Sequence, residues 1–126
     1  MKREIKISEA EWEVMKVIWK QSPLSAQDVA DKLNKKPVWH PKTVKTLINR
    51  LVKKGVLRYE KLGRIHLFSP LLSESQCILN ESESFLDRVF GGSLQPMVAQ
   101  LVKHRKLSAA DIQELQKILR GKERNK

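Results

Sequence analysis

The sequence predicts a mainly α-helical protein with one small β-hairpin, in which an N-terminal winged helix is followed by a region of three helices. Two observations predict this fold class. Apolar residues recur at helical spacing along most of the chain, with serine or proline near the start of several segments and glycine near the end. Between residues 56 and 69 the period changes, and two short runs of strand-forming residues flank a glycine. We therefore expect residues 1–70 to form the winged-helix domain and residues 71–126 to form a helical domain.

The first helix is predicted to begin after Ser8 and to run to about Lys20. Ser8 and Glu11 have the spacing of a capping box, in which the hydroxyl accepts from one backbone N–H and the carboxylate accepts from the other. Only a narrow strip of this helix is polar, namely Glu9, Glu13, Lys16 and Lys20. We expect the helix to be buried on more than one side, with Trp12 and Trp19 in the core. A stacking role for either tryptophan is the rarer alternative.

A second, shorter helix is predicted after Pro23, with Ser25–Asp28 at its start. Its apolar stripe is thin and follows helical spacing through Ala26, Val29, Ala30 and Leu33. We interpret this helix as a scaffold element. The segment Asn34–Trp39 is then a connector, longer than the tight turn of a minimal helix-turn-helix.

The third helix is predicted from His40 to Gly55. Pro41 suits a first helical turn, where its N–H is not needed, and Gly55 suits the left-handed residue that ends a helix. On a helical wheel one arc is apolar: Val44, Leu47, Ile48, Leu51 and Val52. The opposite face is cationic or polar: Lys42, Thr43, Lys45, Thr46, Asn49, Arg50 and Lys53.

This polar face carries no acidic residue. A solvated surface helix usually mixes acids with its lysines, because i,i+4 ion pairs stabilise it. An acid-free face indicates instead a partner that brings the negative charge, and Thr, Asn and Arg can reach base edges as well as phosphates. We interpret this segment as a DNA recognition helix in which Arg50 contacts a base while Lys53 and Lys54 contact phosphates. The alternative is a basic helix that is merely solvated.

Two predicted strands, Val56–Glu60 and Ile65–Ser69, form a hairpin whose turn contains Gly63. In a winged helix the third helix enters the major groove, and the hairpin tip touches the backbone or the minor groove beside it. Lys61 and Arg64, at the basic tip, are therefore candidate DNA contacts. In the second strand, His66 has no acid or thiol at ligand spacing, which favours a strand histidine over a metal ligand. We expect the chain to bind no metal and no cofactor.

A long helix is predicted to follow Pro70, from Ser73 to about Phe90, where Gly91-Gly92 ends it. Cys77 lies near the edge of its apolar face as a small filler. Ser93 can cap the next helix, and Lys103–Lys106 forms a polar turn after it. Residues 108–111 open a last helix, which we expect to end at Gly121, with a frayed tail behind it.

The apolar stripes of these helices predict a homodimer. Three helices in about fifty residues have too little mutual surface to bury such stripes, and a twofold dimer would let two winged helices read an inverted repeat. The predicted interface residues are Ile78, Phe85, Val89, Leu94, Met97, Val98, Leu101, Val102, Ile112, Leu115 and Leu119. The alternative is that the stripes dock on residues 1–70 of the same chain.

The net charge of +11 is distributed unevenly. Residues 1–70 hold 16 Lys and Arg against 7 acids, whereas residues 71–126 hold 9 against 7. This asymmetry predicts a nucleic-acid-binding N-terminal part. An RNA-binding protein would favour exposed aromatic residues on a sheet, whereas Tyr59 and Phe68 flank only a two-stranded hairpin.

Catalysis and a membrane location are both disfavoured. The three histidines His40, His66 and His104 are scattered through different predicted elements, and neither a nucleophile elbow nor a phosphate-binding loop is present. No apolar run approaches the about 20 residues of a membrane span. The basic start MKREIKIS is not followed by an apolar signal region, and the single cysteine cannot form an intramolecular disulfide. We therefore expect a cytoplasmic protein that is not an enzyme.

Two separated motifs, SEAEWEVMKVIW at Ser8–Trp19 and WHPKTVKTLINRLVKKG at Trp39–Gly55, resemble the penicillinase-repressor family of winged-helix repressors, which also includes copper-responsive members. The likeness continues through the hairpin and through LSAADIQELQKIL at Leu107–Leu119. The resemblance implies a homodimeric repressor that binds a double-stranded operator and controls β-lactamase or related resistance genes. It also implies that six residues lie at the DNA: Trp39, His40, Lys42, Thr43, Thr46 and Arg50.

Two departures from the family pattern bear on the inducing signal. Copper-responsive members carry paired cysteines near the C-terminus, whereas this chain has no cysteine after Cys77, which disfavours copper sensing. The β-lactam-responsive members are inactivated when a membrane sensor leads to cleavage of an Asn-Phe bond in the dimer domain. The matching bond here is Gln100-Leu101. The alternative function is a winged-helix regulator of unrelated genes, for example in metal or stress response, without control by proteolysis.

Overall fold

The computed structural model describes residues 5–33 and 39–124. It divides into two compact units, residues 1–82 and residues 83–126, each of which is described by itself. Most of the predicted connector, residues 34–38, lies outside the described residues, and so do residues 1–4 and the end of the tail.

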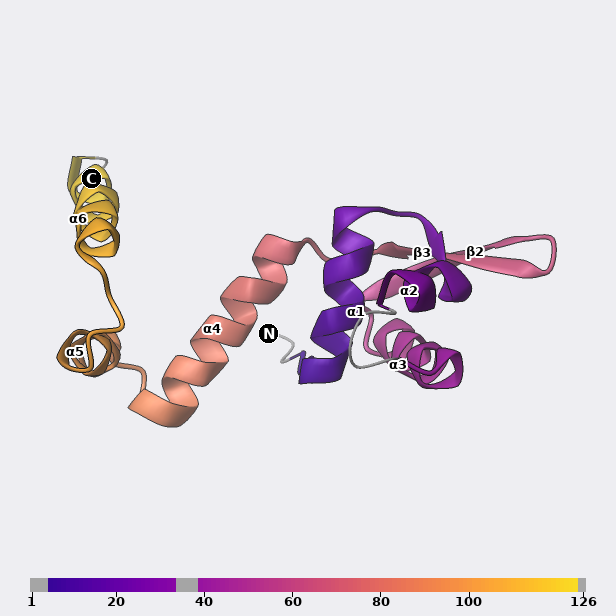
Figure 1. Ribbon diagram of the computed structural model, residues 1–126, viewed down its shortest axis with the longest axis horizontal. Coiled ribbons are helices and arrows are strands. Elements are labelled where there is room, and N and C mark those ends of the chain that lie inside the picture. Colours follow the sequence, from indigo (N-terminus) through magenta and orange to yellow (C-terminus); the bar gives the residue numbers. More distant parts are fainter. Residues whose placement is uncertain (1–4, 34–38, 125–126) are drawn as a thin grey trace. The chain divides into compact units, whose positions relative to one another are not determined.

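The first unit is a helix-turn-helix followed by a β-hairpin wing (Figure 1). Its elements, in chain order, are α1 (Glu9–Lys20), β1 (Leu24–Ser25), α2 (Ala26–Leu33), α3 (Pro41–Lys53), β2 (Leu57–Leu62), β3 (Ile65–Pro70) and the start of α4 (Glu74–Phe90). The predicted fold class is confirmed, and the predicted ends of α1, α3 and α4 agree with the structure to within about two residues.

The sheet has three strands in the order β1-β3-β2, all antiparallel. The sequence predicted only the hairpin, in which Tyr59 pairs with Phe68 and Lys61 pairs with His66. Strand β1 was missed because two residues, Leu24 and Ser25, are too short to show an alternating pattern. They become a strand only because β3 offers them a free edge, with Leu24 opposite Phe68.

The core of this unit lies between the helices and the sheet. Fully buried side chains come from α1, α2 and α3 and include Val14, Ile18, Val29, Val44 and Ile48. The predicted apolar arc of α3 is confirmed, because four of its five members are buried and Val52 is half-buried. Burial of this arc against α1 and α2 turns the opposite, polar face of α3 outward.

Several helices begin with the same local device, a serine paired with an acceptor three residues later. In α1 the Ser8 N–H donates to Glu11 Oε1 over 2.8 Å, and the Glu11 N–H donates to Ser8 Oγ over 3.2 Å. Ser25 with Asp28, Ser73 with Gln76, and Ser108 with Asp111 form equivalent reciprocal pairs. Ser93 is different, because it stands at the N-cap of α5 without a side-chain cap bond.

A buried ion pair connects the start of α1 to the end of α3. Glu11 is 1% exposed, and its Oε1 accepts from Lys54 Nζ over 2.5 Å. Lys54 Nζ also donates to the backbone oxygen of Lys6 over 2.6 Å. Burial raises the pKa of the Glu11 carboxyl, but the hydrogen bonds and charge of Lys54, together with the Ser8 N–H, outweigh burial and lower the pKa below 4.5. Glu11 therefore caps one helix and anchors another.

The beginning of α4 packs on the winged helix. Cys77 is buried in the core, where burial raises the pKa of its thiol. Asn80 Nδ2 donates to Ile5 O over 2.9 Å, and Trp19 Nε1 donates to Leu72 O over 3.0 Å. Trp19 also lies 5.5 Å from Trp12, ring centroid to ring centroid, so both tryptophans are structural. Residues 71–82 thus belong with the first compact unit, and a domain boundary at residue 70 stays a prediction.

The second unit consists of the end of α4 with α5 (Leu94–Lys103) and α6 (Ala109–Arg124). The prediction that the last helix ends at Gly121 was wrong, since α6 runs through this residue. A glycine inside a helix costs only about 1 kcal/mol relative to alanine, and the residues around Gly121 are mostly good helix formers. No side chain described in this unit is buried, and the large apolar ones are largely open to solvent. None of the helices in the described part of the chain could span a bilayer.

Candidate nucleic-acid interface

The outer face of α3 is exposed along its whole length. The side chains that the sequence assigned to this face, Lys42, Thr43, Lys45, Thr46, Asn49, Arg50 and Lys53, are all exposed in the structure. No acid lies in the first turn, and Arg50 and Lys53 are in the last. Gly55, at φ +81°, ends the helix: its N–H donates to Val52 O, and the Val56 N–H donates to Leu51 O. The local sequence thus sets both the length of the helix and the side that it exposes.

Three predicted contacts, in the first half of α3 and just before it, also have structural roles. His40 is the N-cap, and its Nδ1 accepts from the Lys42 N–H over 3.1 Å, which leaves Nε2 as the outward donor. Thr46 Oγ1 donates to Lys42 O over 3.0 Å, so its hydroxyl proton is used within the helix. Trp39 is half-buried against the core. Only part of each side chain is therefore available to a ligand.

Lys54 is placed differently from its neighbours. The sequence grouped it with Lys53 as a phosphate contact, but its Nζ pairs with buried Glu11. The wheel could not show this, because Glu11 is 43 residues away in the sequence. The Lys54 ammonium group is thus already paired with a carboxylate, unlike Lys53, and its contact with a phosphate stays a prediction.

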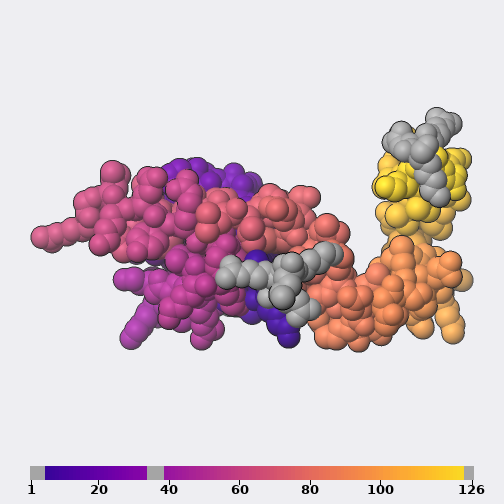
Figure 2. All heavy atoms as spheres, turned by 180° about the vertical axis from the view of Figure 1, so that it is seen from behind, coloured from indigo at the N-terminus to yellow at the C-terminus, as the bar shows by residue number. Residues whose placement is uncertain are grey.

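The wing places cations at the end of the hairpin. Lys61 and Arg64 are exposed, and Gly63 adopts φ +65° between them, which a residue with a Cβ rarely adopts. Figure 2 shows the hairpin projecting from the body of the first unit. The tip also exposes two large apolar side chains, Leu62 at 67% and Ile65 at 54%.

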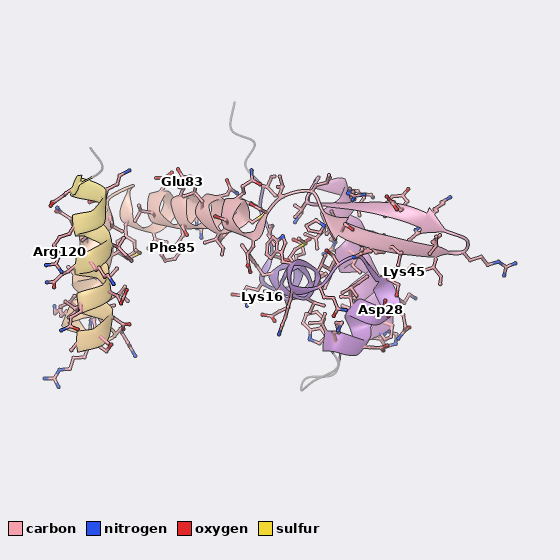
Figure 3. The ribbon with its side chains drawn as sticks, turned by 90° about the horizontal axis from the view of Figure 1, so that it is seen from above. Lys16, Asp28, Lys45, Glu83, Phe85 and Arg120 are labelled. Atoms are coloured by element: carbon pink, nitrogen blue, oxygen red, sulfur yellow. The ribbon has the colours of Figure 1, made fainter. Side chains whose placement is uncertain are left out.

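A groove of about 340 Å³ separates α3 from the wing. Except for Ser25 of β1, the residues that line it come from α2, α3 and the hairpin: Ala26, Gln27, Lys45, Asn49, Arg64, Ile65, His66 and Phe68. None of the residues lining it is acidic. Figure 3 shows Lys45 on the side of α3 next to the hairpin. His66 and Gln27 were missed as site residues, although the alternation of β3 puts His66 on the same face as buried Phe68.

A wider groove of about 670 Å³ lies between α1 and α2. Its charged side chains are mixed in sign, with Glu13 and Asp31 beside Lys16 and Lys20. Within the described ranges, no group of three or more His, Cys, Asp or Glu side chains could hold a metal ion. Of these two grooves, only the one between α3 and the wing is therefore lined by cations without an acid.

The comparisons with known proteins agree with this geometry. The family model for the penicillinase repressor matches residues 7–121. The chain is similar to a penicillinase repressor of Bacillus licheniformis, with 44% identity over 119 residues that cover 94% of this chain and 93% of the relative. It is 37% identical over 116 residues to the methicillin resistance regulatory protein MecI of Staphylococcus aureus (strain N315), covering 92% and 94% of the two chains. Among solved structures it resembles the monomeric form of Bacillus licheniformis BlaI in complex with the blaP half-operator, with a TM-score of 0.50 and 47% identity over 60% of this chain and 92% of that one.

Proposed function

The chain belongs to the penicillinase repressor family, and on that premise we propose that it represses transcription by binding an inverted-repeat operator as a homodimer. The observation that carries this proposal is the exposed, acid-free face of α3, beside a wing with a basic tip. The similar BlaI structure is a complex with a half-operator, which supports DNA as the ligand of this chain. The genes that we propose as targets are β-lactamase or related resistance genes.

In this proposal α3 lies in the major groove and divides its contacts by residue type. Arg50 can form two parallel hydrogen bonds to a guanine edge, which reads sequence, whereas Lys53 supplies a point charge to a phosphate. Lys61 and Arg64 reach the backbone or the minor groove beside the helix. Phosphate contacts fix the register of the protein on the duplex, so that the base contact falls at the right position.

The first prediction separates the two kinds of contact. Arg50→Ala should cost about 1–3 kcal/mol of binding free energy on the operator and relax selectivity at one base-pair position. Lys53→Ala should weaken binding to all DNA sequences similarly, and it should reduce the salt slope, the slope of log affinity against log salt concentration, by about one. Both side chains are exposed, so neither change should alter the fold. Binding titrations on operator and mixed-sequence duplexes over a salt series measure both effects. Equal losses of Arg50→Ala on the two duplexes would show that Arg50 does not read a base.

The proposed dimer is supported by the apolar side chains that the second unit leaves exposed to solvent. Val89, Leu94, Val102, Ile118 and Leu119 are between 50% and 64% exposed in the single chain. Isolated exposed apolar residues are common, but several on three consecutive helices indicate a surface that a partner covers. A second copy of this chain is the partner that also supplies the second half-site reader.

We propose that repression ends by cleavage of this second unit. The bond Gln100-Leu101 lies inside α5, where Gln100 O accepts from the His104 N–H and Leu101 O accepts from the Lys106 N–H. A protease needs an extended substrate, so the last turns of α5 must open before cleavage. Both residues are near the end of a ten-residue helix, where local opening costs least.

The second prediction concerns the sequence at this bond. A protease that cuts only Asn-Phe should leave this chain intact, and Gln100→Asn with Leu101→Phe should make it cleavable. Both forms would be incubated with an active sensor pathway, and the fragments would be sized by mass spectrometry. Cleavage of the unaltered chain at Gln100-Leu101 would refute this discrimination while supporting induction by proteolysis.

We assign the chain binding and no catalytic step, because the two relatives are named as a penicillinase repressor and a methicillin resistance regulatory protein, and the exposed face of α3 is cationic. It places the protein in the cytoplasm, where a repressor meets its DNA.

A further inference from the structure

We propose that the groove between α2, α3 and β3 seats a phosphate group of the DNA backbone, and that the imidazole of His66 donates to it. The inference rests on the proposed function, because it needs α3 in the major groove. It adds a contact on the inner face of the wing to those on α3 and at the wing tip. The ligand is a phosphodiester of duplex DNA, so the contact is independent of base sequence.

The position of the groove follows from how a winged helix meets DNA. When α3 occupies the major groove and the wing tip lies at the adjacent minor groove, one sugar–phosphate strand separates the two grooves. That strand must pass between the helix and the wing. The groove of about 340 Å³ is the space that the structure leaves there, with Lys45 on its helix side and Arg64 and His66 on its wing side.

The imidazole of His66 is held in a defined orientation. It stacks on the ring of Tyr59 with centroids 4.9 Å apart and an interplanar angle of 23°. It also lies edge-on to the buried Phe68, with centroids 6.4 Å apart. Despite these contacts His66 is exposed, so its ring edge is open to a ligand. A ring that is fixed before binding loses less conformational freedom when it forms a hydrogen bond.

The charges around His66 favour an anion. Lys61 stands directly opposite on β2, Arg64 lies at the turn, and Lys45 faces the groove from α3. The nearby acids are turned to other partners: Asp28 accepts from the Ser25 N–H, Asp31 accepts from Gln27 Nε2, and Glu60 pairs with Arg58 on the other face of the hairpin. A phosphate in the groove would therefore meet Lys45 from α3 and Arg64 from the hairpin turn, and no carboxylate among the groove-lining side chains.

The chemistry of imidazole gives this contact a measurable signature. A histidine that pairs with phosphate does so more strongly when it is protonated, and histidine ordinarily changes charge between about pH 5 and pH 8. Binding to any duplex should then be stronger at lower pH. It should also release more counterions from the DNA, because a protonated histidine neutralises one more phosphate. His40 is a second imidazole beside the DNA, so the contribution of His66 is the difference between the wild type and a His66 variant.

The test measures binding of the full-length protein to a mixed-sequence duplex over a salt series at about pH 6 and about pH 8. For the wild type the log–log salt slope should be steeper at the lower pH, and His66→Gln should reduce this difference by about one per subunit. His66→Lys, which carries a permanent charge, should give the steeper slope at both pH values. His104→Gln is the matched control, since it makes the same change in the second unit and should behave as the wild type.

A His66→Gln protein that keeps the full pH dependence of the salt slope would overturn the proposal. So would a His66→Lys protein that binds no more tightly than the wild type at the higher pH. Thermal unfolding verifies that both variants fold. If His66→Gln does not fold, His66→Lys alone tests the proposal. Failure of the wild type itself to bind duplex DNA would refute the proposed function instead, so the two failures are distinguishable.

Discussion

Leu101→Glu is expected to convert the protein from a dimer to a monomer. Leu101 belongs to the stripe of α5 that we propose as the centre of the interface, together with Leu94, Met97, Val98 and Val102. In the single chain Leu101 is 37% exposed, so part of its surface already packs within the unit and the rest is open to the second copy that we propose. A carboxylate left unpaired in an apolar interface costs several kcal/mol. That loss is enough to dissociate a dimer of ordinary affinity.

Sedimentation at low micromolar concentration measures this result. Ala99→Glu is the matched control, because it adds the same charge to an exposed position about 200° away on the α5 wheel and should leave the dimer intact. The Leu101→Glu monomer should also bind the operator far more weakly, since it loses the gain from tethering two half-site readers. A Leu101→Glu protein that sediments as a dimer would place the interface elsewhere.

Lys54→Met is expected to destabilise the protein by about 3 kcal/mol at neutral pH, because it leaves the Glu11 carboxylate buried without its cation. This figure is at the low end of the range for broken buried pairs, since the Lys54 side chain is 35% exposed and partly screened by solvent. Lys53→Met, one residue earlier on the exposed face, is the matched control and should change stability little. Urea denaturation of the three proteins measures the difference.

The same ion pair predicts a pH dependence with a definite sign. The folded-state pKa of Glu11 is lowered from 4.5, so its stabilising contribution is present above this value and is lost as the pH falls through the folded pKa. The stability of the wild type should therefore approach that of Lys54→Met on acidification. A difference that stays constant down to acid pH would show that Lys54 acts through packing of its aliphatic stem and not through charge.

The sequence predicted those elements whose causes are local. The ends of α3 follow from Pro41 and Gly55, and its two faces follow from a period of 3.6 residues. What it missed depends on contacts between distant residues. Strand β1 exists because β3 offers an edge to Leu24 and Ser25, and the Glu11–Lys54 pair joins residues 43 positions apart.

The candidate site shows the same division. The exposed cations of α3 and the wing tip were identified from spacing and turn chemistry, and the structure places them outward as expected. The groove was not identified from the sequence, because its walls come from α2, α3 and β3 and form only when these elements pack together. Lys54 was predicted as a phosphate contact, and its pairing with Glu11 could not be predicted for the same reason: a helical wheel describes one helix and not the carboxylate of another.

The most direct test of the proposal is protected-site mapping of the full-length protein on genomic DNA, with Arg50→Ala beside the wild type. Our account predicts protection of a small number of inverted repeats, each half-site facing one α3. It also predicts that Arg50→Ala, which keeps the fold and most of the charge, loses this selectivity. Protection that is uniform along the DNA, or discrete sites that Arg50→Ala protects as well as the wild type, would contradict it.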